Sequence, residues 1–163
     1  AAAAYALQVP LVGIRQGLES LQPVKGRVVA QLATSGARVI DDTYNANPVS
    51  MCAAVDILAA FSGRTVLVLG DMGELGEWAE QGHRDVGAYA AGKVSALYAV
   101  GPLMRHAVAA FGAEGRHFAD QASLIAALAN EQGPSTTLLI KGSRSAAMDK
   151  VVAALCASTE EAH

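Results

Sequence analysis

The chain alternates between short segments that are apolar at nearly every position and longer segments with the spacing of apolar residues typical of helices. The clearest of the short segments are residues 64–71 (RTVLVLGD) and 135–142 (STTLLIKG). A strand without a polar face is buried on both sides, which is typical of a parallel sheet covered by helices. The pattern therefore predicts an α/β fold, Rossmann-like, with a mostly parallel sheet and helices on both faces.

The expected elements follow one another in regular order after residue 37. The expected helices are residues 48–61, 79–91, 102–111, 120–132 and 146–158, and the expected strands between them are residues 64–71, 95–101, 116–119 and 135–142. Before them, the β-rich segments 27–33 and 37–44 are joined only by TSG, which predicts an antiparallel hairpin near the N-terminus.

A boundary is expected near residues 22–27 (QPVKGR), where Pro23 and Gly26 interrupt a helical pattern. We place it after residue 22, so that residues 1–22 form helices of one unit and residues 23–163 a second domain. Because the chain begins within a helical pattern and without Met, we expect it to belong to a longer protein.

Composition excludes several classes of protein. The 163 residues are 52% hydrophobic, too apolar for a disordered chain, and the net charge of −3 argues against nucleic acid as a partner. No stretch is long enough to span a membrane. The two cysteines, Cys52 and Cys156, lie in apolar helical patterns and are expected to be free thiols in a reducing compartment, which favours the cytoplasm.

Three strand-to-helix segments carry unusual polar residues: residues 41–48 (DDTYNANP), 70–77 (GDMGELGE) and 141–145 (KGSRS). In parallel α/β sheets, ligands bind beyond the carboxyl ends of the strands. If the fold is as predicted, these segments lie along the same edge of the sheet. None contains G-x-G-x-x-G, so a dinucleotide fingerprint is absent.

The segment KGSRS combines two cations and two hydroxyls at the exit of a strand and the expected entrance of a helix. Free backbone N–H groups and the helix dipole favour an anion at such a place. Lys141 and Arg144 therefore indicate a carboxylate or phosphate site. A capped helix with solvated cations is an equally good interpretation of this segment alone.

The segment DDTYNANP has a structural and a functional interpretation. Asn47 followed by Pro48 is a good N-cap and first-turn pair. An acidic residue at a strand end can accept the two hydroxyls of a ribose, and Tyr44 could stack on a base. The alternative is a turn with solvated acids and a packed tyrosine. The segment GDMGELGE also has two interpretations: it is either a loop that flanks a substrate amine or only a tight turn.

Taken together and in this order, VKGR, VIDDTYNANPVSM, VLVLGDMGELGE, HRDVG and LLIKGSRSAAMDKVV resemble the Mur ligase family. The narrower resemblance is to members that join D-alanyl-D-alanine to UDP-N-acetylmuramoyl-tripeptide in peptidoglycan synthesis. It implies an ATP-dependent, amide-forming ligase with an acyl-phosphate intermediate, of which this chain is the C-terminal domain.

The resemblance also implies what lies elsewhere. In the family, a central domain holds the phosphate loop, a carbamylated lysine and the Mg²⁺ ligands. Residues 1–22 resemble the last helices of that domain. None of the central domain's catalytic parts is found in this sequence, so the chain alone is expected to be inactive and to contain no metal site.

The resemblance assigns roles to eight residues. Residues expected at the nucleotide are Arg27 at the ATP phosphates, Asp42 at the ribose hydroxyls, and Tyr44 and Asn45 nearby. Residues expected at the dipeptide are Asn47 in the cleft, with Lys141, Ser143 and Arg144 at its carboxylate. Asp71 and Glu74 are weaker candidates for the neighbourhood of the incoming ammonium group.

Two other functions stay open. The alternating pattern and Asp42 also fit a free-standing Rossmann-type nucleotide-binding enzyme, although the missing glycine fingerprint weighs against it. A non-catalytic binding module is the second alternative, because no nucleophile, metal cluster or phosphate loop stands out.

Overall fold

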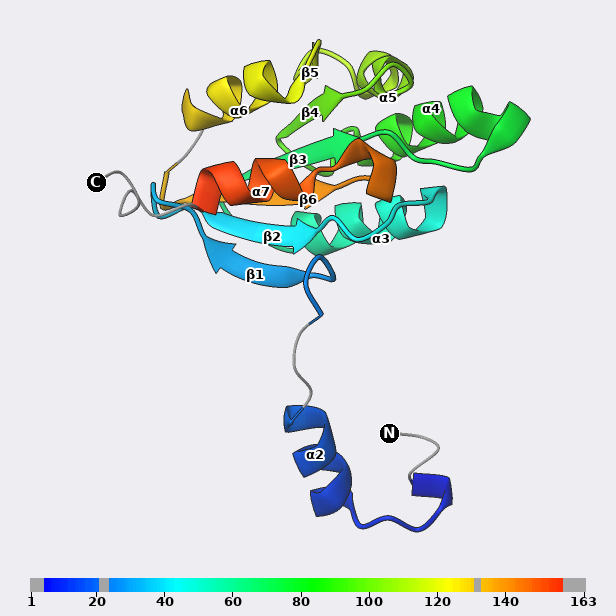
Figure 1. Cartoon of the computed structure of the whole chain (residues 1–163), viewed down its shortest axis with the longest axis vertical. Coiled ribbons are helices and arrows are strands. Elements are labelled where there is room, and N and C mark those ends of the chain that lie inside the picture. The colour runs from blue at the N-terminus through cyan, green and yellow to red at the C-terminus, as the bar shows by residue number, and fades with distance from the viewer. Residues whose placement is uncertain (1–4, 21–23, 131–132, 157–163) are drawn as a thin grey trace.

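A computed structural model describes residues 5–20, 24–130 and 133–156 (Figure 1). Its strands are β1 (Val29–Leu32), β2 (Arg38–Asp42), β3 (Arg64–Gly70), β4 (Ala96–Val100), β5 (Gly115–Phe118) and β6 (Thr136–Lys141). Its helices are α2 (Leu11–Glu19), α3 (Pro48–Ala59), α4 (Ala79–Ala90), α5 (Met104–Phe111), α6 (Gln121–Asn130) and α7 (Asp149–Cys156), with short 3-10 turns η1 (Gly76–Trp78) and η2 (Arg144–Ala146).

The six strands form one sheet in the order β1-β2-β6-β3-β4-β5. β1 is antiparallel to β2, and all the other neighbours are parallel. The predicted fold class and N-terminal hairpin are confirmed. β6, the last strand in the chain, lies between β2 and β3, so the carboxyl ends of β2, β6 and β3 are adjacent.

The sheet is buried on both faces because successive strand residues point into two separate cores. Leu139 packs on the face covered by α3 and α4, whereas Leu138 packs on the face covered by α7 and α6. All six residues of β6 are buried, as expected for the central strands of a covered sheet. Figure 1 shows α7 in front of the strands and α3 behind them.

The chain after β6 differs from the sequence prediction, which continues a helix directly from residue 146. Instead, η2 is followed by Ala147 in the left-handed region, with φ 48°, and α7 begins only at Asp149. The reason is close packing: a Cβ at Gly70 would lie 2.8 Å from the side chains of Ala146 and Met148. Ala146 and Met148 pack against Gly70 at the carboxyl end of β3, and α7 begins after them, at Asp149.

The domain boundary predicted after residue 22 lies among residues 21–23, outside the described residues, and stays a prediction. α2 lies apart from the sheet in Figure 1. Among the described residues, no helix has the length and apolar character needed to cross a membrane. Both cysteines are partly buried free thiols, and burial raises the pKa of each.

Candidate functional site

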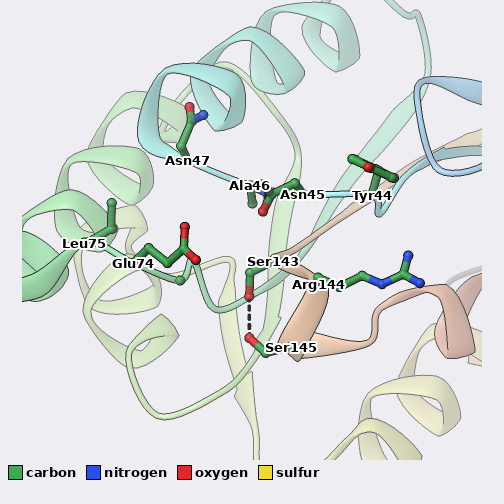
Figure 2. A pocket seen from close by; sticks show the side chains of 10 residues that line it. Tyr44, Asn45, Ala46, Asn47, Glu74, Leu75, Ser143, Arg144 and Ser145 are labelled. Atoms are coloured by element: carbon green, nitrogen blue, oxygen red, sulfur yellow. Dashed lines mark hydrogen bonds between the residues drawn. The ribbon is translucent and has the colours of Figure 1, made fainter.

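Three loops meet at the carboxyl edge of the sheet because β2, β6 and β3 are neighbours there. They enclose a cavity of about 820 Å³. Its lining residues are Tyr44, Asn45, Ala46, Asn47, Gly73, Glu74, Leu75, Ser143, Arg144 and Ser145. Figure 2 shows these side chains around a common space, with the loop after β2 facing the loops after β3 and β6. All three segments singled out from the sequence therefore contribute to one site.

The loop after β2 is held by its own polar side chains. Asp41 is buried, and its Oδ1 accepts hydrogen bonds from the backbone N–H of Thr43 at 3.1 Å and from its hydroxyl at 2.6 Å. Further along, the Asn47 side chain caps α3 by accepting from the Ser50 N–H, and the Ser50 hydroxyl accepts from the Asn47 N–H. The predicted N-cap at Asn47 is confirmed. The Asp41 bonds therefore hold the loop at its β2 end, and the reciprocal capping holds it at its α3 end.

Asp42 and Lys141 end the adjacent strands β2 and β6 and pair with each other. Lys141 Nζ donates to Asp42 Oδ2 at 2.6 Å and to the backbone carbonyl of Asn45 at 2.9 Å. The Lys141 side chain is only 4% exposed and that of Asp42 is 15% exposed. Neither residue lines the cavity. The ammonium group instead ties the strand ends to the loop that forms one wall.

Arg27 lies on Tyr44 at the outer end of the same loop. The Arg27 guanidinium carbon is 4.2 Å from the centre of the Tyr44 ring, and the Gly26 carbonyl accepts a hydrogen bond from the Tyr44 N–H at 2.9 Å. Gly26 adopts φ 76°, and a Cβ there would lie 3.0 Å from the Tyr44 nitrogen. The turn that precedes β1 is thus attached to the loop after β2, with an exposed cation at its surface.

Asp71 and His83 hold the loop after β3 through hydrogen bonds to neighbouring backbone groups. Asp71 accepts from the N–H groups of Leu103 and Met104, so its carboxylate occupies the N-terminus of α5. His83 is fully buried; its Nε2 accepts from the Met72 N–H at 3.0 Å while Nδ1 lies 2.6 Å from the Ala79 carbonyl. Because Nε2 accepts from the Met72 N–H, Nδ1 is the ring nitrogen that donates to the Ala79 carbonyl. No motif in the sequence indicates that His83 supports this particular loop.

The loop after β6 is joined to the loop after β3 by a hydrogen bond from the Ser143 N–H to the Asp71 carbonyl, at 2.9 Å. The hydroxyls of Ser143 and Ser145 lie 3.0 Å apart (Figure 2). Arg144 is exposed at the cavity. Its guanidinium has no hydrogen-bond or ion-pair partner within residues 5–20, 24–130 and 133–156.

Five of the eight predicted site residues line the cavity: Tyr44, Asn45, Asn47, Ser143 and Arg144. Arg27, Asp42 and Lys141 lie next to it, through their contacts with Tyr44 and Asn45. The predicted roles of all eight stay predictions. Sequence reasoning missed Gly73 and Leu75 as lining residues; their only signal was membership of the glycine-rich segment.

A second, smaller hollow of about 250 Å³ lies beside the first and shares Ser145 with it. Its other lining residues include Asp71 and Gln121, whose polar groups already bind the start of α5 and the carbonyls of Ala146 and Ala147. In the described part of the chain, no group of three or more His, Cys, Asp or Glu side chains could hold a metal ion.

The fold and this edge define a class of protein: a Rossmann-like α/β domain with a ligand cavity where the strand order changes direction. Residues 26–144, well over half of the chain, match the family described as "Mur ligase, glutamate ligase domain". The chain therefore belongs to the Mur ligase family.

Named relatives agree with this assignment. The chain is 44% identical, over 163 residues, to the UDP-N-acetylmuramoyl-tripeptide–D-alanyl-D-alanine ligase of Escherichia coli K12. The alignment covers 95% of this chain and 35% of the relative. The chain thus spans about a third of the length of the curated relatives it matches.

Solved structures give the same result. MurF from Acinetobacter baumannii superposes with a TM-score of 0.84 at 38% identity, covering 96% of this chain and 35% of that one. MurF from Thermotoga maritima, solved in complex with ADP, has a TM-score of 0.74 at 23% identity. The superposition covers 88% of this chain and 35% of the Thermotoga maritima chain, and it supports the fold alone.

Proposed function

We propose that this chain is the C-terminal domain of an ATP-dependent ligase that adds D-alanyl-D-alanine to UDP-N-acetylmuramoyl-tripeptide in peptidoglycan synthesis. The observation that carries the proposal is the meeting of DDTYNANP, GDMGELGE and KGSRS at one cavity. The names of the relatives, from Escherichia coli to Bacillus subtilis, support the choice of substrates. The reaction proceeds through an acyl phosphate, which the dipeptide amine attacks.

The dipeptide half of the site lies between the loops after β6 and β2. Arg144 supplies a cation that has no hydrogen-bond or ion-pair partner among the described residues, and Ser143 and Ser145 line the same cavity. A guanidinium with neighbouring hydroxyls suits a planar carboxylate. Asn47 contributes to the opposite wall while it caps α3. This half holds the dipeptide carboxylate and so positions its other end for attack.

The nucleotide half lies at the outer end of the loop after β2. Arg27 is exposed on the Tyr44 ring, where it reaches the ATP phosphates when the domains close. Asp42 keeps one carboxylate oxygen, Oδ1, outside its contact with Lys141, and that oxygen accepts the ribose hydroxyls. Asn45 lies between the two halves.

Lys141 acts through its neighbours in this proposal. Its ammonium group is already engaged by Asp42 and the Asn45 carbonyl. It therefore fixes the ends of β2 and β6 and the loop that forms one wall of the cavity, which keeps the nucleotide half and the dipeptide half in place relative to each other.

The remaining parts of the ligase lie outside this chain. A central domain supplies the phosphate loop, the carbamylated lysine and the Mg²⁺ ligands, and residues 1–22 belong to its last helices. The segment around Pro23 is the hinge, and closure about it excludes water from a hydrolysable intermediate. The ligase works in the cytoplasm, where its nucleotide-linked substrates are found.

The test is a phosphate-release assay on the longer protein that contains this chain. Release should require ATP, UDP-N-acetylmuramoyl-tripeptide and D-alanyl-D-alanine together. Arg27→Ala should lower turnover roughly 100-fold, the scale of losing one charge-stabilising group, without unfolding the domain. Lys25→Ala, an exposed cation two residues earlier, is the matched control. Phosphate release that does not depend on the dipeptide would contradict the proposed function.

A further inference from the structure

Val28 has an unusual backbone conformation for its residue type. Its φ is 53°, in the left-handed region where the Cβ of an L residue crowds its own backbone and only glycine is free of strain. The described part of the chain has four such non-glycine residues, Gln8, Val28, Glu74 and Ala147, and Val28 is the one with a branched Cβ. For a β-branched residue this conformation is a genuine outlier, and such outliers cluster at functional positions.

Val28 lies where the ladder between β1 and β2 is interrupted without a change of register. The regular ladder begins with the pair of Val29 and Asp41. Beyond Val28, the Tyr44 N–H donates to the Gly26 carbonyl at 2.9 Å. Gly26 and Tyr44 are the residues that face each other if the register of Val29 and Asp41 is continued. No residue is inserted, so this is not a β-bulge, and the interruption changes only the direction of the chain.

In a continuous strand, Arg27 would point away from Tyr44. Arg27 would lie opposite Thr43, and paired residues of an antiparallel ladder project from the same face. Tyr44 follows Thr43 in the chain and would project from the other face. The structure has the opposite arrangement, because the Arg27 guanidinium carbon lies 4.2 Å from the centre of the Tyr44 ring. The left-handed residue that follows Arg27 accounts for this change of side.

The face from which Arg27 is turned away is already filled. Asp41 and Thr43 are 1% and 7% exposed, and the Thr43 hydroxyl donates to the Asp41 carboxylate. On the other side, Arg27 is exposed, and its guanidinium lies on the ring of Tyr44, which lines the cavity. The two contacts at Tyr44, with a cation and with a carbonyl, offset the strain of the left-handed residue.

We propose that Val28 is a positioning residue whose left-handed backbone turns Arg27 onto Tyr44 and so orients the guanidinium for the phosphates of a nucleotide. This inference rests on the proposed function, in which Arg27 reaches those phosphates, and adds how the chain presents Arg27 to them. A guanidinium that the fold has already oriented loses less conformational entropy on binding than a freely moving one. Val28 itself does not touch the nucleotide.

The first measurement is the orientation of Arg27 in the isotope-labelled 163-residue chain, read from the NMR shifts of its side-chain protons. Protons held over an aromatic ring move upfield, and Tyr44→Leu should abolish this effect. Val28→Pro should remove most of it, because proline fixes φ at about −65° and cannot be left-handed. Val28 precedes the first pair of an edge strand, a position that tolerates proline. Val28→Asn should keep the upfield shift, since asparagine tolerates the left-handed region.

The second measurement compares the KM for ATP with the KM for D-alanyl-D-alanine in the longer ligase, because a residue with only a structural role would change both. Val28→Pro should raise the KM for ATP roughly tenfold, the scale of one charge-assisted contact, and leave the KM for the dipeptide unchanged. Val28→Asn should keep the KM for ATP close to that of the unaltered ligase, because it keeps the backbone conformation.

Melting temperatures test the strain itself. Val28→Asn should raise the melting temperature of the chain by about 3 °C, since asparagine is less strained in this region than valine. Val24→Asn is the matched control: Val24 is an exposed valine of the same turn without a positive φ, and its replacement should give no rise. Equal melting temperatures for the two asparagine variants would show that Val28 is not strained and would overturn the inference without the proline variant.

The remaining outcomes separate this inference from the proposed function. If Val28→Pro leaves Arg27 over the Tyr44 ring, or leaves the KM for ATP unchanged while Arg27→Ala raises it, Val28 does not position Arg27 and the proposed function is unaffected. If Arg27→Ala itself changes neither turnover nor the KM for ATP, the nucleotide role of Arg27 is wrong and the inference is overturned with it.

Discussion

Lys141 Nζ lies 2.6 Å from Asp42 Oδ2, and this pair joins the ends of two strands that are 99 residues apart in the chain. The same ammonium group donates to the carbonyl of Asn45 at 2.9 Å. One buried cation thus connects β2, β6 and the loop that forms a wall of the cavity. Its loss affects both the stability of the domain and the geometry of the site.

Replacing Lys141 by Met should destabilise the domain by about 3 kcal/mol, because it leaves the Asp42 carboxylate partly buried without its partner. The double variant with Asp42→Asn should recover part of that loss, since no uncompensated charge remains. Urea unfolding of the two variants measures both quantities. Lys93→Met, which removes the ammonium group of an exposed pair with Asp56, is the control and should have a small effect. Equal losses for Lys141 and Lys93 would contradict the importance of the buried pair.

Replacing Gly87 by Ala should destabilise the domain by about 3 kcal/mol or more, as overpacking does when backbone must move. Gly87 lies in α4, and a Cβ there would come 2.0 Å from the backbone carbonyl oxygen of Ala107 in α5. Gly82→Ala in the same helix is the matched control. Its Cβ would meet side-chain atoms of Leu75 and Pro48 at 3.2 and 3.3 Å and no backbone atom within those distances, and alanine favours the helix. Thermal unfolding should show a lower melting temperature for Gly87→Ala than for Gly82→Ala. Similar melting temperatures for the two variants would show that α4 and α5 are not packed this closely.

The stability that Asp120 contributes should depend on pH in acid. Hydrogen bonds from the backbone and side chain of Ser123 lower the pKa of Asp120, which caps α6. A lowered pKa in the folded state means that the contribution is complete above the unfolded value, about 4, and is lost as the pH falls through the lower folded value. The difference in melting temperature between the unaltered chain and Asp120→Asn should therefore shrink below pH 4. A difference that stays constant from pH 7 to pH 3 would exclude this linkage.

The sequence predicted the strands and the loops well because these depend on local patterns. The run of residues 66–70 (VLVLG) contains no polar side chain, and the carboxyl ends of parallel strands share an edge of the sheet. The order of the strands was not predictable, because insertion of β6 between β2 and β3 depends on packing between distant segments. That insertion is what makes KGSRS the centre of the site.

The side-chain roles were less accessible from the sequence. Lys141 and Arg144 are equivalent cations in the motif, yet Lys141 is buried against Asp42 whereas Arg144 is exposed and lines the cavity. The difference comes from the register of β2 and β6, which places Asp42 opposite Lys141. Among the described residues, the Glu74 side chain has no hydrogen-bond or ion-pair partner, whereas Asp42 and Asp71 each have one, and no motif shows this difference.

An NMR titration of the isotope-labelled chain with D-alanyl-D-alanine and, separately, with ATP tests directly whether this edge of the sheet binds the two ligands. The dipeptide should shift the amides of Asn47 and residues 143–145, and ATP should shift those near Arg27 and Tyr44. Arg144→Ala should abolish the dipeptide shifts, whereas Lys150→Ala, an exposed cation on α7 that does not line the cavity, should not. A folded chain whose amides at the cavity respond to neither ligand would contradict the assignment of this edge as the acceptor and nucleotide site.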